Sequence, residues 1–352
     1  MKFSFRPENN FKFWTGQISS PSFRLGEAIH QEISPYDETK IAVILLDENF
    51  DETDDVQYFD TLAEASGYIS RNSSADYSIY IGKNAGISSI SSTFSGKTNL
   101  IKISIPNTTT LLYSSAFKNC TNLKKVEIKS NNISDIPFEA FSGCTSLEEF
   151  TMPSVVNIGK KAFLNCSSLT SFTFPRGLAS IGQSAFEGCG IQHLNLQIAG
   201  ISVGESAFNR SGLTSVNLEL LGECTVGNGV FANCAGLESV VYSGADISQG
   251  MFGYCTSLET VALGTDVYII NSYAFRGCES LGMLNLPSIK RIFSNVLKDS
   301  GVSTVLIGSS IENISYDSFS GDSYLTSISI GLQRDSISGA PWGATNAVVN
   351  WA

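Results

Sequence analysis

Residues 158–175 read Ile158-Gly-Lys-Lys-Ala-Phe-Leu-Asn-Cys-Ser-Ser-Leu-Thr-Ser-Phe-Thr-Phe-Pro175, and a related stretch, Ile181-Gly-Gln-Ser-Ala-Phe-Glu-Gly-Cys-Gly-Ile-Gln-His-Leu-Asn-Leu196, follows soon after. The central phenylalanine recurs every 21 to 24 residues, as Phe94, Phe117, Phe141, Phe163, Phe186, Phe208, Phe231, Phe252, Phe275, Leu297 and Phe319. A fixed period of this length indicates stacked structural repeats. The sequence therefore predicts a solenoid of about eleven units.

Each unit begins with a pair of apolar groups and a turn. An Ile or Val lies five residues before the Phe in most copies, and a small residue, often Ala, directly precedes it. This spacing predicts a short helical or 3₁₀ turn. Before the cysteine position, eight units carry Gly or Asn, which tolerate the left-handed backbone of a sharp turn. These residues are Gly96, Asn119, Gly143, Asn165, Gly188, Asn233, Gly277 and Gly321.

The second half of each unit reads Leu-x-x-Val-x-Leu, for example Leu169, Phe172 and Phe174. Alternation with a period of two predicts a short strand. Three units shorten the turn before it by one residue and place Gly190, Gly212 or Gly301 there, as a tighter turn requires. One unit buries too little apolar surface to order itself, so neighbouring units must stack into one body.

The unit resembles the BspA-like (Treponema-type) leucine-rich repeat, whose pattern is close to I-G-x-x-A-F-x-x-C-x-x-L-x-x-V-x-L-P. The match covers about residues 87–330. The resemblance implies a curved α/β leucine-rich repeat solenoid with a parallel strand sheet on one face. It also implies adhesion and recognition at bacterial surfaces, with relatives in gut bacteria, spirochaetes, protozoa and phage tail proteins.

Three segments are expected: an N-terminal α+β domain over 1–82, the solenoid over 83–330 and a C-terminal cap over 331–352. Residues 1–40 are aromatic and irregular and are a candidate anchoring surface. Residues 41–82 predict a βαβ unit, with strands at 41–46 and 76–81. Between them, a Thr61–Glu64 capping box starts a helix that turns Leu62, Ala65 and Ile69 inward.

An acidic stretch, Asp47–Asp55, lies between the first strand and the helix. Asp47, Asn49 and Asp51 have the spacing of an EF-hand loop. However, Glu52 replaces the turn glycine, and Tyr58 stands where the bidentate Glu belongs. A solvated acidic loop is therefore expected here, and no metal.

The overall composition argues against several classes of binding partner. The net charge is −11 and only 16% of residues are charged, which disfavours nucleic acid and anionic membrane surfaces. The longest apolar run, Ile41–Leu46, is too short to cross a bilayer. The N-terminus has no apolar core of a signal peptide. Either a signal was removed, or the protein is exposed without one, as a phage tail protein would be.

Catalytic chemistry is not expected. Seven of eight cysteines occupy one position of the repeat, and Ser211 and Ser300 substitute for them there. This favours small buried thiols over disulfides or a metal ladder. The two histidines, His30 and His193, exclude a three-His zinc site, and no G-x-S-x-G elbow accompanies His193. The sequence predicts no cofactor and no enzyme.

The remaining function is surface recognition. Side chains between the apolar strand positions point outward, and those of the middle units are uncharged. The candidate ligand-binding residues are Ser171, Thr173, His193, Asn195, Ser215 and Asn217. The expected ligand is a cell-surface protein or glycan, bound by a surface adhesin or a phage tail receptor-binding protein. The alternatives are a structural spacer or assembly component of a larger particle. Residues 1–40 would then contact virion or surface-anchor partners.

Overall fold

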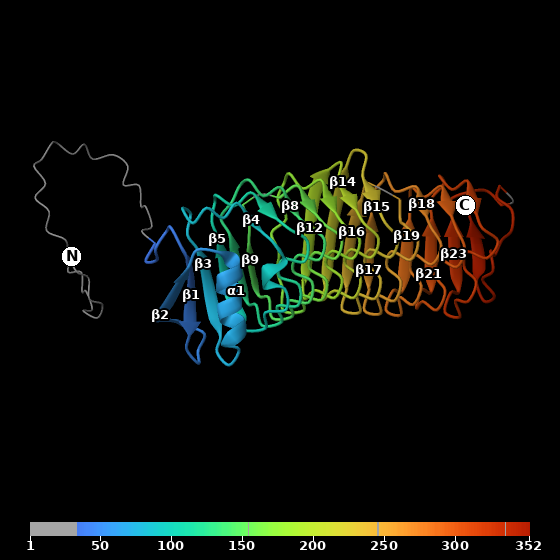
Figure 1. Ribbon diagram of the computed structural model, residues 1–352. Helices are drawn as coiled ribbons and strands as arrows, with labels where there is room; N and C mark the ends of the chain where they lie inside the picture. The colour runs from blue at the N-terminus through green and yellow to red at the C-terminus, as the bar shows by residue number, and fades with distance from the viewer. Residues whose placement is uncertain (1–33, 154, 245, 335) are drawn as a thin grey trace, which may run out of the picture. The chain divides into compact units, whose positions relative to one another are not determined.

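One repeat forms one layer of a β-solenoid, in which a longer strand, a two-residue strand and a row of turns surround the core. The computed structural model describes residues 34–352 except 154, 245 and 335, and residues 36–352 form one body. About 12 layers stack along this body (Figure 1). The predicted parallel-strand solenoid is confirmed. The candidate anchoring segment 1–40 falls mostly outside the described residues.

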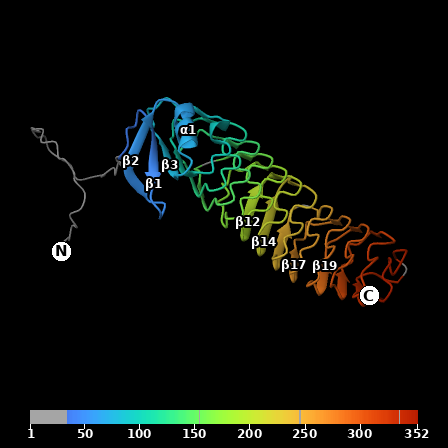
Figure 2. The ribbon, with the colours of Figure 1, turned by 60° about the horizontal axis from the view of Figure 1, so that its bottom comes forward.

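The longer strands lie side by side, and their outward side is called the strand face (Figure 2). Three sheet sections make it up. The first, in spatial order, contains β2 (Glu52–Phe59), β1 (Ile41–Leu46), β3 (Tyr77–Ile81), β5 (Leu100–Ile105), β7 (Lys125–Ile128) and β9 (Glu149–Thr151). The second contains β12 (His193–Ala199), β14 (Ser215–Leu221), β16 (Ser239–Ser243) and β17 (Thr260–Leu263). The third contains β19 (Met283–Leu286), β21 (Thr304–Ile307), β23 (Ser327–Ile330) and β24 (Val348–Trp351).

The two-residue strands form a second face. They are β4 (Ser89–Ile90), β6 (Leu111–Leu112), β8 (Asp135–Ile136), β10 (Asn157–Ile158), β11 (Ser180–Ile181), β13 (Ser202–Val203), β15 (Thr225–Val226), β18 (Ile269–Ile270), β20 (Arg291–Ile292) and β22 (Asn313–Ile314). Their inward residue is the Ile, Val or Leu that precedes each Phe. Their outward residues form hydrogen-bonded pairs, such as Asn157 Nδ2 to Asp135 Oδ1 at 2.7 Å and Thr225 Oγ1 to Ser202 Oγ at 2.9 Å.

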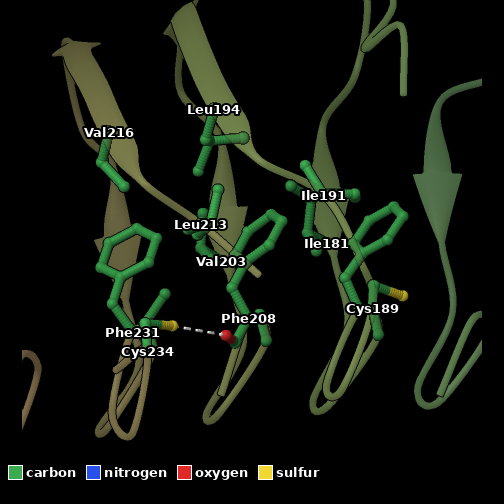
Figure 3. Close-up of a cluster of buried hydrophobic side chains, with 14 of the residues drawn as sticks. Ile181, Cys189, Ile191, Leu194, Val203, Phe208, Leu213, Val216, Phe231 and Cys234 are labelled. Atoms are coloured by element: carbon green, nitrogen blue, oxygen red, sulfur yellow. Dashed lines mark hydrogen bonds between the residues drawn. The ribbon is translucent and has the colours of Figure 1, made fainter. Parts of the chain in front are cut away.

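A column of stacked rings runs through the core. From Phe94 to Phe275, successive ring centroids lie 5.2–5.8 Å apart with nearly parallel planes, and every ring is fully buried. Stacking neighbours therefore supplies the burial that a single layer lacks. Figure 3 shows Phe208 and Phe231 of this column beside the inward aliphatic residues.

The cysteines of the repeat form a second buried column. Each of the seven thiols is free and donates to the carbonyl oxygen of the preceding layer's Phe, as Cys234 does to Phe208 at 3.1 Å (Figure 3). Burial raises the pKa of Cys234 to about 11 and that of Cys278 to about 12. They are thus neutral packing groups, as interpreted from the sequence.

The turns differ from the helical form that the spacing predicts. Only Ser92–Phe94 (η1) is a 3₁₀ helix among the described repeats. In most other units two left-handed residues flank the Phe, for example Glu139 (φ 54°) and Gly143 (φ 76°) around Phe141. All eight Gly or Asn positions named above have positive φ, as predicted. The second left-handed position has no such signature, because Ser, Glu, Lys and Tyr also occupy it.

In the shortened turns, the glycines serve close approach between layers. A Cβ on Gly190 would lie 2.3 Å from the carbonyl oxygen of Ser167, and one on Gly301 would lie 1.9 Å from that of Glu279. Neither residue has a positive φ. The reason for glycine is therefore space and not backbone conformation.

The segment before the repeats is not the predicted βαβ unit. β1 pairs antiparallel with both β2 and β3, and β3 then pairs parallel with β5 of the first repeat. The chain reverses at Asp47, whose Oδ1 accepts hydrogen bonds from the backbone nitrogens of Asn49 and Asp51. The acidic stretch therefore forms a tight turn and the start of the edge strand β2.

Two predicted details of this segment are confirmed. α1 (Leu62–Arg71) begins with the capping box of Thr61 and Glu64, and it buries Leu62, Ala65 and Ile69. At the other end of the body, Trp342 is fully buried, and its main-chain carbonyl oxygen accepts a hydrogen bond from the backbone nitrogen of Phe319. Here β24 pairs parallel with β23. These last residues add a layer to the stack.

Candidate functional site

The middle layers present the side chains that the sequence predicts on the strand face. β12 alternates strictly, with Leu194, Leu196 and Ile198 buried and the residues between them exposed. β14 follows in register, so that His193 lies opposite Ser215 and Asn195 lies opposite Asn217. The alternation of apolar and polar residues thus places four of the six candidate residues on two neighbouring strands.

These four side chains form two hydrogen-bonded pairs. His193 Nδ1 lies 2.9 Å from Ser215 Oγ and 3.4 Å from Thr214 Oγ1. Asn217 Nδ2 donates to Asn195 Oδ1 at 3.3 Å. The pairs hold donors and acceptors in a fixed arrangement on the surface.

The amide pair ends at an apolar residue. Asn217 Oδ1 is buried and finds no hydrogen-bond partner among the described residues. The next residue in register is Val241, which has no donor in its side chain. An unpaired buried acceptor costs about 1–3 kcal/mol. The unpaired oxygen of Asn217 therefore lowers the stability of the protein at this position.

Ser171 and Thr173 do not join the array. Both are exposed, but residues 170–174 form no strand, and no hydrogen bond of either residue occurs in the described part of the chain. The cause lies inward, where this layer has Phe172 and Phe174 in place of the smaller Leu194 and Leu196 of β12. The strand face is interrupted here, between β9 and β12.

A cavity opens at this interruption, and the sequence interpretation missed it. Its volume is about 210 Å³, and it is lined by Phe150, Thr151, Met152, Phe172 and Thr173. The signal that could have found it is the set of bulky side chains at inward positions of two adjacent units.

A larger cavity of about 460 Å³ lies on the second face. Its lining is polar and includes Cys224, Asn228, Asp246, Ser248 and Asn271. It faces the shortest unit, in which Phe252 follows Phe231 by 21 positions, and here the first ladder of two-residue strands ends at β15. Asp246 Oδ1 is already held by the backbone nitrogens of Tyr268 and Ile269.

The described residues show neither a metal-binding cluster nor a hydrogen bond between His193 and a carboxylate. No cluster of three or more His, Cys, Asp or Glu side chains there could hold a metal ion. The hydrogen bonds of His193 go to hydroxyl groups, and none in the described part joins it to a carboxylate. In the same part of the chain, no helix combines the length and the apolar character needed to span a membrane.

Comparison with solved structures returns bacterial proteins that are about one-fifth identical to this chain. A leucine-rich repeat protein from Bacteroides ovatus is 20% identical, with 75% of this chain and 87% of that chain covered and a TM-score of 0.47. A leucine-rich cell-surface protein from Faecalibacterium prausnitzii is 20% identical, with 74% and 91% covered and a TM-score of 0.41. The pneumococcal vaccine antigen PcpA is 19% identical, with 68% and 72% covered and a TM-score of 0.43.

No curated protein sequence matches the chain. The family model of the BspA type leucine-rich repeat region, by contrast, matches six copies over residues 77–160, 134–245 and 245–341, which together span more than half of the sequence. The chain belongs to the BspA-type leucine-rich repeat family.

Proposed function

We propose that this chain is a non-catalytic recognition protein whose strand face binds a protein or a glycan on a cell surface. The observation that carries this proposal is the pair of hydrogen bonds that holds His193 on Ser215 and Asn217 on Asn195. Side chains already held in place lose little further freedom when a ligand binds. The BspA-like repeat adds support, because its resemblance implies adhesion and recognition at surfaces.

The place of display is part of the proposal. A bacterial cell surface and a phage tail both fit a protein that meets another cell, and in either case residues 1–40 would hold the chain to its assembly. The genomic neighbourhood distinguishes them. An in-frame signal or lipobox upstream supports the cell surface, whereas a start codon among tail genes supports the virion.

A structural spacer is the second candidate. The stack of about 12 layers favours it, because at about 4.8 Å per strand the body extends over about 55 Å. A spacer needs no particular side chains on its strand face. Recognition and spacing therefore make opposite predictions for variants of that face.

The test compares two variants in which four outward polar residues become alanine. The strand-face variant changes Thr173, His193, Asn195 and Asn217, and the control changes Asn157, Ser180, Ser202 and Thr225 on the second face. Binding of the full chain to intact cells and to a glycan array is measured, with circular dichroism melts to check folding. A loss of tenfold or more in the strand-face variant alone supports recognition. Unchanged binding in a folded strand-face variant contradicts it.

A further inference from the structure

The interruption of the strand face is local. On one side of it, the backbone nitrogen of Ser168 donates to the carbonyl oxygen of Thr145, and β10 pairs with β11 on the second face. Toward the next layer, the backbone nitrogen of Gln192 donates to Thr170. Only residues 171–174 leave the ladder, while the layers around them stay joined. The opening is therefore a feature of the strand face and not a break in the solenoid.

Aromatic packing explains the opening. Phe150 meets Phe141 and Phe163 edge to face at 5.1 and 4.9 Å, and Phe172 meets Phe163 and Phe186 at 5.4 and 5.0 Å. These two side chains form a second aromatic row between the core column and the strand face. A phenylalanine packed edge to face on another ring occupies more space than the Leu or Val at this position in other layers. This crowding is the physical reason why residues 171–174 form no strand.

The resulting cavity has an apolar floor and a hydroxyl rim. Phe150, Met152 and Phe172 are half-buried, while Thr151 and Thr173 are exposed beside them. No charged side chain lines it. Its volume of about 210 Å³ is below the roughly 300 Å³ at which sites for whole small molecules begin. Its size suits one side group of a larger ligand.

Polar main-chain groups border the cavity. In the described part of the chain, no hydrogen bond within the protein uses the backbone nitrogens or carbonyl oxygens of residues 171–174. Within each sheet section, groups of this kind are satisfied by the neighbouring strand. An extended peptide has apolar side chains flanked by amide groups. One such side chain would fill the apolar floor, while the amides beside it hydrogen-bond to the main-chain groups of residues 171–174.

We infer that the opening binds one large apolar side chain, such as Leu, of an extended peptide in a partner protein. This inference rests on the proposed function, because it uses the same strand face. A glycan fits less well, since the acetyl methyl group of an amino sugar would fill only a small part of the floor. Four neighbouring residues, His193, Asn195, Ser215 and Asn217, then contact the flanking polar parts of the partner.

The experiment uses the smallest peptide unit as the probe. N-acetyl-leucine methylamide, N-acetyl-serine methylamide and N-acetylglucosamine are each titrated into the full chain, and binding is followed by saturation-transfer NMR. The leucine probe should bind with a Kd on the order of 1 mM. The serine probe, which has the same amides and no large apolar group, should bind at least tenfold more weakly.

Matched substitutions locate the binding. Thr173→Trp places a ring over the opening, and Thr151→Trp does so from the other rim if the first variant fails to fold. Val241→Trp is the control, because Val241 is exposed at the same position of β16, which pairs with a strand on each side. Tenfold weaker leucine binding in a rim variant, with no change in Val241→Trp, supports the inference.

Three results overturn it: equal binding of the leucine and serine probes, no effect of either rim variant, or preferential binding of N-acetylglucosamine. The last result identifies a glycan site. None of them decides the proposed function, which the four-residue strand-face variant tests on cells. If the four-residue variant loses cell binding but the unmodified chain does not bind the leucine probe, the strand face is still the recognition surface. The opening is then not a peptide site.

Discussion

At the scale of single residues, one position of the cysteine column carries a carboxyl group in place of a thiol. Asp322 follows Cys278 and Ser300 at the same position of successive layers and is almost completely buried. Ser300 Oγ donates to Asp322 Oδ2 at 2.8 Å, and the backbone nitrogens of Tyr324 and Leu325 donate to Oδ1. Burial raises the pKa of this carboxyl, and the hydrogen bonds only partly oppose the rise.

The raised pKa predicts a pH dependence of stability. The unfolded carboxyl loses its proton near pH 3.9, and the folded one loses it at a higher pH. The native state therefore loses stability as pH rises from about 4 through the folded pKa. Asp322→Asn removes this ionisation. The unfolding free energy of the variant should therefore rise relative to that of the wild type as pH increases over this range. Denaturant titrations at several pH values measure the difference. If the unfolding free energy of the wild type instead rises relative to that of Asp322→Asn as pH increases, the native state stabilises the carboxylate, and the prediction is wrong.

The unpaired oxygen of Asn217 gives a second residue-scale prediction. Val241 lies beside it in register and is 45% exposed, so little core packing depends on it. Val241→Asn can donate to Asn217 Oδ1 and extend the amide pair, which should stabilise the protein by about 0.5–1.5 kcal/mol. Ala262→Asn is the matched control, since it lies beside Val241 and gains no such acceptor. Chemical denaturation of both variants isolates the hydrogen bond. Equal effects of the two substitutions would contradict it.

At the scale of elements, the interrupted strand should differ from its neighbours in dynamics. Residues 172–174 have no backbone hydrogen bonds in the described structure, whereas residues 194–196 and 216–218 pair along β12 and β14. Amides of residues 172–174 should therefore exchange with solvent much faster than those of the two strands. Hydrogen–deuterium exchange with peptide resolution measures this. Equal protection of the three segments would mean that the ladder is continuous.

The same elements show where sequence-based prediction ends. Period-two alternation correctly placed His193, Asn195, Ser215 and Asn217 outward. It also fits residues 169–174, where no strand forms, because alternation records which side chains face inward and not whether they fit there. The size of Phe172 matters only against the rings of adjacent layers, and that arrangement is three-dimensional. The direction of β1 likewise depends on a turn at Asp47 that an acidic stretch does not reveal.

At the scale of the whole molecule, the repeat period was the most informative signal. Each Phe from Phe94 to Phe275 lies where the period of 21 to 24 residues places it, in one fully buried column. This holds because the stack has one repeated environment, so each copy of the pattern meets nearly the same neighbours. The final layer has no such signal, because Trp342 follows a different local sequence and completes the stack through its contacts with Phe319.

The central claim is that this pattern sorts side chains, with the aromatic column inside and the polar series on the strand face. Thermal and chemical denaturation of Phe186→Ala and Thr173→Ala test it most directly. Phe186 is fully buried and stacks on Phe163 and Phe208 at 5.2 and 5.3 Å, so its loss should cost about 3–5 kcal/mol. Thr173 is exposed, and its change should cost about 0.5 kcal/mol or less. Equal losses from the two substitutions would contradict the account.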